Sequence, residues 1–370
     1  MKNFWQSNTN RLFTIVFLWI IFVVIAIAVA IHQFPFTPTF PYYTTDLSPH
    51  YNRFFSTFAH FDGIHYLRIA SAGFYPDGGE VAFFPAYPFL IHGLINLGVD
   101  KLVAGISISL ISLLISLLIL HDLYPKHGWK FVALLLSFPA SFYFLSVYTE
   151  SLYLLAFALM LYFIKKKMYY AAALAVALST ATRFVGIAMI AYLVMSMWGR
   201  VDWKKIFAAA LISLTGLASY MVYLWKTLGD PLAFIHSQPI FGMGRSGGEI
   251  VFLPQVIFRY LKMTFTADPS TLLYWRAVAE ISLFILVVTV LIKYWRKLSL
   301  PELFYTLTVL IIPTLSGTLS SYPRYVLAAI PLLIVLSQEL SKRSFILTIL
   351  IQSVFLFVSI ALFTSGLFVA

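Results

Sequence analysis

The first candidates for acid–base chemistry are a carboxylate and an imidazole three residues apart, in the stretch FAHFDGIHYLRIASAGF. If this stretch is helical, Asp62 and His65 lie on one face of the helix, and Arg68 follows one turn later. A carboxylate held beside an imidazole can act as a general base. The alternative interpretation is a solvated loop in which Asp62 caps a short helix.

Three more charged residues stand next to or within long apolar runs. Glu150 lies in SFPASFYFLSVYTESLYLL, Arg183 in ALAVALSTATRFVGIAMIAYL, and Arg324 in SSYPRYV, where Tyr325 follows it. An ionisable residue in such a run is a functional candidate, and arginine is the preferred planar donor to phosphate. The alternatives are that Glu150 complements a helix N-terminus capped by Thr149, and that both arginines are interfacial anchors.

One motif is set aside. The run Gly242-Met243-Gly244-Arg245-Ser246-Gly247 matches the G-x-G-x-x-G pattern, but a dinucleotide fingerprint follows a strand and opens a helix in a βαβ unit. We interpret this run as a loop that could act as a lid. There is no HExxH, Walker or nucleophile-elbow sequence. The sequence therefore demands no cofactor, although scattered histidines and carboxylates leave room for a divalent metal.

The composition predicts the elements that must position these residues. Of the 370 residues, 61% are hydrophobic and 11% are charged, whereas a soluble domain has roughly 25% charged residues. The apolar runs are continuous rather than alternating, which favours membrane helices over a barrel. The net charge of +11 has no clustered basic face, so nucleic-acid binding is not expected. The absence of cysteine excludes disulfides and thiol catalysis.

The first apolar run, 12–31, follows Lys2 and Arg11, and Ala28-Val29-Ala30 within it resembles a signal-peptide cleavage site. A signal peptide has an apolar core of about 7–15 residues, whereas about 20 are needed to span a bilayer. We therefore expect a retained first helix, and an all-α polytopic membrane protein with a single domain, 1–370. The eleven expected spans are 12–31, 102–120, 131–147, 150–164, 168–182, 184–198, 206–226, 271–292, 303–319, 324–340 and 345–367.

The basic residues predict the orientation of these helices. With the N-terminus in the cytoplasm, the cytoplasmic segments carry 15 of the 25 Lys and Arg residues, as the positive-inside rule requires. Two long segments, 32–101 and 227–270, then lie outside and are the natural places for chemistry. This topology requires residues 84–98 to form an interfacial helix. Short predicted helices such as 150–164 commonly line cavities.

Four segments, in order, resemble the GPI mannosyltransferase II (PIG-V-like) family of the GT-C glycosyltransferases. They are FDGIHYLRIASAGF with AFFPAYPFL, FPASFYFLSVYTESLYLL, TATRFVGI and SYPRYVLAAIP, and the similarity extends over about residues 10–335. Phe61 replaces the family's Trp, Thr149 replaces a Ser, and Phe184 and Val185 depart from the third segment. The cores of the motifs survive, so these departures bear on substrate choice.

The resemblance implies a GT-C-like bundle with a long first extracytoplasmic loop, in a cytoplasmic or ER-type membrane. It implies a hexosyltransferase, with mannose as the favoured sugar, whose donor is a polyprenyl- or dolichyl-phosphate sugar. The expected acceptor is an extracytoplasmic glycolipid or glycan, because the eukaryotic acceptor does not transfer with the fold. Asp62 falls on the position of the family's catalytic base.

On this hypothesis a single displacement inverts the anomeric carbon. The residues expected to bind the donor and its phosphate are Arg324, Arg183 and His65. The residues expected to bind substrate or to support the others are Glu150, Arg68 and Tyr325.

Two other classes of function remain open. A secondary transporter or lipid flippase would also have short helices and charges within the membrane. The charged candidates, however, gather near the outer face rather than the midplane, and no inverted repeat is visible. A membrane protein without catalysis is the third class. The enzyme hypothesis requires Asp62, Arg183 and Arg324 to meet at one cavity, which a structure can test.

Overall fold

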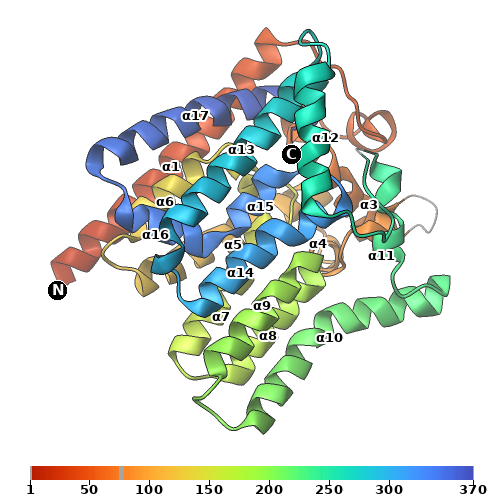
Figure 1. The fold of residues 1–370 in the computed structure, drawn as a ribbon. Helices are drawn as coiled ribbons and strands as arrows, with labels where there is room; N and C mark the ends of the chain where they lie inside the picture. The colour runs from red at the N-terminus through yellow and green to blue at the C-terminus, as the bar shows by residue number, and fades with distance from the viewer. Residues whose placement is uncertain (1, 75–78, 243, 370) are drawn as a thin grey trace.

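The computed structural model describes residues 2–74, 79–242 and 244–369. All regular secondary structure in these ranges is helical, which confirms the predicted all-α class. The helices form a bundle with several short helices gathered at one side (Figure 1).

Five helices in the described ranges are long and apolar enough to cross a membrane. Each of them coincides with a predicted span, and each is more than 20 residues long, the length that a bilayer requires. They are α1 (Lys2–Gln33), α5 (Lys101–Leu123), α10 (Trp203–Leu228), α13 (Leu272–Tyr294) and α17 (Lys342–Thr364).

The other predicted spans are shorter helices, so the described residues do not contain eleven helices of full spanning length. These helices are α6 (Gly128–Ser137), α7 (Glu150–Lys165), α8 (Tyr169–Thr182), α9 (Ile187–Met197), α14 (Leu300–Ile311), α15 (Tyr322–Ala328) and α16 (Ile330–Glu339). Three predicted spans are interrupted. The segment 131–147 breaks before Pro139, 303–319 continues beyond α14 as a 3₁₀ turn containing Pro313, and 324–340 breaks before Pro331. Proline removes a backbone donor and disfavours helix at the residue before it.

The predicted outside segments fold into short helices. The first contains α2 (Arg53–Ser56), α3 (Asp62–Ala72) and α4 (Ala86–Ile95), and the second contains α11 (Ala233–His236) and α12 (Leu253–Thr266). The predicted interfacial helix at 84–98 corresponds to α4, which packs against α3 and α5. Figure 1 shows α3, α11 and α12 on one side of the bundle, away from the N-terminus and the α16–α17 connection.

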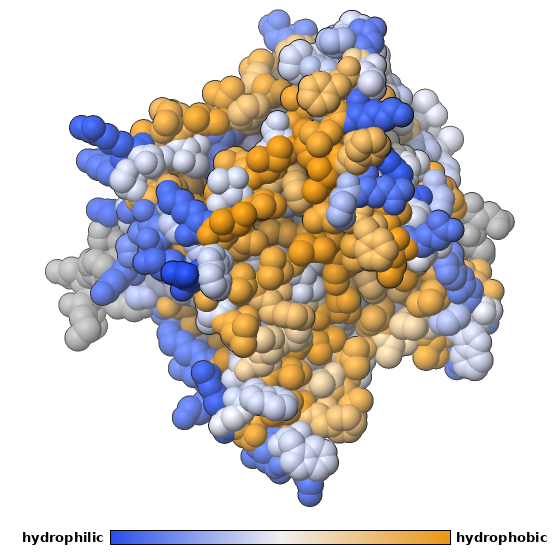
Figure 2. Space-filling model, in the orientation of Figure 1, coloured by the Kyte–Doolittle hydropathy of each residue, from blue (hydrophilic) through white to orange (hydrophobic). Residues whose placement is uncertain are grey.

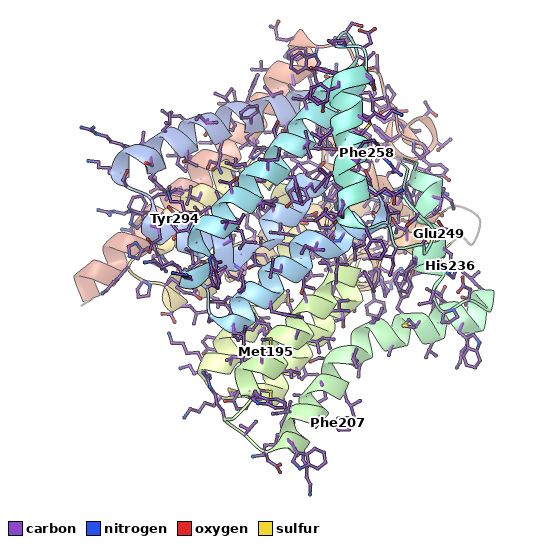
Figure 3. The ribbon with its side chains drawn as sticks, in the orientation of Figure 1. Met195, Phe207, His236, Glu249, Phe258 and Tyr294 are labelled. Atoms are coloured by element: carbon purple, nitrogen blue, oxygen red, sulfur yellow. The ribbon has the colours of Figure 1, made fainter. Side chains whose placement is uncertain are left out.

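The surface of the long helices is largely apolar. Phe17 of α1, Phe207 of α10, Ile285 of α13 and Leu350 of α17 are all exposed. Apolar side chains cover the middle of the face in Figure 2, and hydrophilic residues gather along its edges. Figure 3 labels Phe207 on α10 and Tyr294 at the end of α13. An apolar belt between two polar rims is the surface that lipid contact requires.

The closest helix packing joins α8 to α10 through a glycine. A Cβ atom built on Gly216 would lie 2.0 Å from the carbonyl oxygen of Ala177 and 2.6 Å from the hydroxyl of Thr180. The Thr180 hydroxyl in turn donates a hydrogen bond to the carbonyl of Ser213 at 2.9 Å. Small residues that let two backbones approach are typical of helix contacts in membranes.

Gly216→Ala is therefore expected to destabilise the fold, because its methyl group meets backbone rather than a mobile side chain. The expected loss is about 1–3 kcal/mol in the free energy of unfolding, measured by thermal unfolding of the detergent-solubilised protein. Gly93→Ala, at a helix position with nothing within 4 Å of the added atom, is the control and should not destabilise. Equal stability of the two variants would show that α8 and α10 are not in this close contact.

Candidate active site

The site is built where three helices begin. Asp62 is the first residue of α3, Glu150 is the first residue of α7, and Arg324 lies in the first turn of α15. Both carboxylates therefore complement the dipoles of their helices. The residues before α3 and α15, Phe61 and Ser321, have positive φ angles of 53° and 68°. Such conformations cost energy in non-glycine residues and cluster at functional sites.

Arg324 joins these helices through an ion-pair chain. Its Nη1 donates to Oδ2 of Asp62 at 2.5 Å, and its Nε donates to Oε1 of Glu150 at 2.6 Å. Nη1 of Arg183 donates to the same Glu150 oxygen at 2.9 Å. We call Asp62, Arg324, Glu150 and Arg183 the ion-pair chain. The side chain of Asp62 is 24% exposed, against 12% for Arg183, 6% for Arg324 and 2% for Glu150, so Asp62 is the most accessible member of the chain.

Aromatic rings surround the arginines of the ion-pair chain. The guanidinium carbon of Arg324 lies 5.1 Å and 4.9 Å from the ring centres of Tyr143 and Tyr148, and that of Arg183 lies 5.8 Å from Tyr325. Cation–π contacts of this kind stabilise a desolvated guanidinium. Tyr143 lies in the 3₁₀ helix Ser141–Leu145 and Tyr148 in the bends that follow it, after the break at Pro139, so that break supplies part of the site.

The charge state of Asp62 follows from these neighbours. Burial by itself raises the pKa of Asp62, but the charge and hydrogen bond of Arg324, with smaller contributions from Arg245 and His65, bring that pKa below the usual range. Asp62 is therefore ionised at neutral pH. It can accept a proton, which is the state that a general base needs.

A cavity of about 570 Å³ opens beside Asp62, within the size range of small-molecule sites. It lies between α3, the start of α15, the turn after α8, and the segment that follows α10. Its polar lining includes Asp62, Arg183, Arg245, Ser320, Ser321 and Arg324. Its apolar lining includes Phe83, Phe184, Phe234, Ile312, Pro313 and Tyr325. The structure thus brings Asp62, Arg183, Arg324 and Tyr325 to one cavity, with Glu150 directly behind them.

His65 and Arg68 lie in a second cluster on α3 and are not among the residues that line this cavity. His65 stacks on Phe83, with ring centres 4.9 Å apart, and its Nδ1 is 3.8 Å from Glu80. Arg68 donates to Glu80 at 3.1 Å and to Asp46 at 2.7 Å. Asp62 and His65 were predicted to share a helix face, but in the described structure they form ion-pair contacts with different residues, Arg324 and Glu80.

Several site residues escaped the sequence analysis. The most important is Arg245, which lines the cavity but lies in the run that resembled a dinucleotide motif. Glu80, the partner of His65 and Arg68, is completely buried. The sequence signal that could have identified Arg245 is a basic residue in the predicted second outside segment, with Gly244 before it and Gly247 two residues after it. Figure 3 shows the nearby residues His236 and Glu249 on the same side of the molecule as α3.

Comparison of the chain with family models, with curated proteins and with solved structures found no match. Across the described ranges, no group of three or more His, Asp and Glu residues could hold a metal ion. The chemistry of the site is therefore inferred from its own residues.

Glu150→Gln is expected to destabilise the fold strongly, because it leaves Arg324 and Arg183 as buried like charges with a weakened partner. Breaking a buried ion pair on one side costs about 3–5 kcal/mol. The free energy of unfolding in denaturant measures this loss. The matched control is Glu339→Gln, which removes the partner of the exposed Lys297 and should cost about 0–1 kcal/mol. If both variants lost similar amounts of unfolding free energy, Glu150 would not be the buried partner that Arg324 and Arg183 require.

Proposed function

We propose that the cavity is the active site of a membrane glycosyltransferase with a GT-C-like bundle. It transfers a hexose, mannose by the resemblance, from a polyprenyl- or dolichyl-phosphate sugar to a glycolipid or glycan acceptor. The observation that carries the proposal is that an ionised, partly exposed carboxylate and a buried guanidinium, Asp62 and Arg324, meet at one cavity wall. A base and a phosphate-binding cation side by side are the two groups that this reaction needs.

The proposed reaction is a single displacement. Asp62 takes the proton of the acceptor hydroxyl, whose oxygen attacks the anomeric carbon of the sugar. The bond between that carbon and the phosphate oxygen breaks, and the lipid phosphate leaves with the electron pair. Arg324 stabilises the negative charge on the phosphate. The anomeric configuration is inverted, because no covalent intermediate with the protein forms.

The ion-pair chain couples donor binding to the strength of the base. In the free protein, Nη1 of Arg324 is held by Asp62 while Nε is held by Glu150. A donor phosphate competes with Asp62 for the guanidinium, whereas Glu150 keeps Arg324 in place from the buried side. Loss of the Arg324 hydrogen bond increases the affinity of Asp62 for a proton. The base is thus strengthened when the donor is present.

The proposed orientation places this cavity on the extracytoplasmic side. The short outside helices α3 and α11 contribute to its wall, while the basic connections and the N-terminus lie at the other side of the bundle (Figure 1). Apolar lining residues such as Phe184, Phe234 and Ile312 suit the prenyl chain of a donor that arrives from the lipid.

A transporter would need a route through the bundle. Behind the ion-pair chain, the next cavity lined by Glu150 and Arg183 has only about 10 Å³, which is room for about one water molecule. The side chains of Tyr153 and Tyr305 are fully buried in the bundle, with their hydroxyls 3.2 Å apart. This packing favours an enzyme with a one-sided site over a transporter.

Asp62→Asn is expected to reduce sugar transfer by about 10²–10⁴-fold, because the amide cannot accept the proton. The assay uses purified, reconstituted protein with radiolabelled polyprenyl-phosphate hexoses and a crude glycolipid acceptor extract. Asp268→Asn, at an exposed turn residue of the second outside segment, is the matched control and should retain activity. Near-normal transfer by a folded Asp62→Asn variant would refute the assignment of the base.

The pH dependence of transfer is expected to have two different acid limbs. The pKa of Asp62 is lowered in the free protein, so kcat/KM should persist to a pH below the usual range of an aspartate and fall as Asp62 becomes protonated. The acid limb of kcat should lie at higher pH, because the bound phosphate has drawn Arg324 away from Asp62. Steady-state rates at limiting and saturating donor measure both limbs, with unfolding followed at each pH as a control. Coincident limbs would contradict the coupling.

A further inference from the structure

Arg245 is the cavity arginine without a carboxylate partner among the described residues. Its Nη1 and Nη2 lie 3.4 Å from the side-chain oxygens of Gln238 and Ser321, which is longer than most N–H···O hydrogen bonds in proteins. Arg183 and Arg324, in contrast, have carboxylate oxygens within 2.9 Å. Glu249, the carboxylate nearest to Arg245 in the chain, is exposed and forms no ion pair with it.

The loop that carries Arg245 is anchored to the opposite wall. The backbone N–H groups of Ser246 and Val251 donate to the carbonyls of Ser316 and Leu315 at 2.8 and 2.9 Å. Arg259 of α12 donates to the carbonyls of Gly317 at 2.7 Å and of Gly244 at 3.3 Å. The loop is therefore held on both sides of Arg245, at Gly244 and at Ser246.

The wall that faces Arg245 is equally well fixed. Arg276 donates to the hydroxyl of Ser320 at 2.8 Å and to Glu280 at 2.9 Å. Tyr260 donates to the other oxygen of Glu280 and accepts a hydrogen bond from the backbone N–H of Leu319. This network holds the segment that ends at Ser321, the residue directly before α15 and its Arg324.

The charges of the cavity indicate what Arg245 binds. Arg183 and Arg324 form ion pairs with Glu150 and Asp62, whereas Arg245 lies beside the buried hydroxyl of Ser321. Glu249 also lines the cavity, but it is exposed, so among the described residues Arg245 is the cavity arginine that no carboxylate pairs with directly. Guanidinium and hydroxyl donors together match the oxygens of a phosphate group. Arg183 is less suited, because Glu150 already holds it.

We infer that Arg245, together with the hydroxyl of Ser321, binds the phosphate of the lipid donor opposite Arg324. This inference rests on the proposed function and adds to it: the donor phosphate is held from two walls, by the loop arginine and by Arg324. The glycine directly before Arg245 is also needed for this arrangement of the loop. Gly244 has a φ of 70°, and a Cβ there would lie 2.8 Å from the guanidinium of Arg259, so a side chain at this position would disturb the anchor.

The test measures binding of three probes to the full-length protein in detergent: farnesyl phosphate, farnesol and inorganic phosphate. The wild type is expected to bind farnesyl phosphate more tightly than either of the other probes. Arg245→Gln should weaken farnesyl phosphate binding by about tenfold or more, the effect of a charged hydrogen bond, without changing farnesol binding. Lys262→Gln, which removes an exposed charge from the neighbouring α12, is the control and should leave all three affinities unchanged.

The outcomes separate the inference from the proposed function. If the wild type prefers farnesyl phosphate and Arg245→Gln binds it equally well, the role of Arg245 is refuted while the proposed function stands. If the wild type binds farnesol as tightly as farnesyl phosphate, the lipid-phosphate donor itself is refuted. If inorganic phosphate binds as tightly, the anion is not a lipid phosphate. Should Arg245→Gln also alter farnesol binding, the ratio of the farnesyl phosphate affinity to the farnesol affinity decides. A ratio about tenfold below that of the wild type supports the inference, and an unchanged ratio overturns it.

Discussion

The buried guanidinium of Arg324 is the interaction on which the site depends. A charge removed from water is tolerated only with close, hydrogen-bonded partners, and Arg324 obtains them from Asp62 and Glu150, which lie 262 and 174 residues away in the chain. The three helices α3, α7 and α15 must therefore begin at the same place. Apolar contacts are not directional, so hydrophobic packing alone would not fix how these three helices are placed along one another. The requirement that the charge of Arg324 be balanced fixes their relative positions.

The irregular backbone near the site has the same physical basis. The break before Pro139 lets the segment 141–149 turn two tyrosines onto Arg324, and the backbone N–H of Val147 donates to the carbonyl of Phe58, next to α3. Non-helical backbone at membrane depth is tolerated where protein surrounds it or a cavity adjoins it. The breaks thus occur where their polar groups find partners, and the long unbroken helices carry exposed apolar side chains.

The amino-acid sequence predicted the all-α class and eleven spans, of which five are helices of spanning length among the described residues. These five could be predicted because the length of an apolar run is a local property of the sequence. It also singled out Asp62, Glu150, Arg183 and Arg324, since a charge in an apolar context is conspicuous. It overestimated the continuity of 131–147, because a hydropathy pattern does not register a helix break. It missed Arg245, whose position depends on loop contacts with residues about 70 positions later. His65 and Asp62 share a helix face by spacing, but Glu80 and Phe83 decide which way the imidazole turns.

The contact at Gly216 has a mechanical consequence. Because this glycine seats α10 directly on the backbone of α8, sliding of one helix along the other is opposed by contact between their backbones. Arg183 follows the last residue of α8, and α10 carries exposed apolar side chains on its other face. The contact at Gly216 thus connects the exposed face of α10, through α8, to the backbone that holds Arg183 beside Glu150.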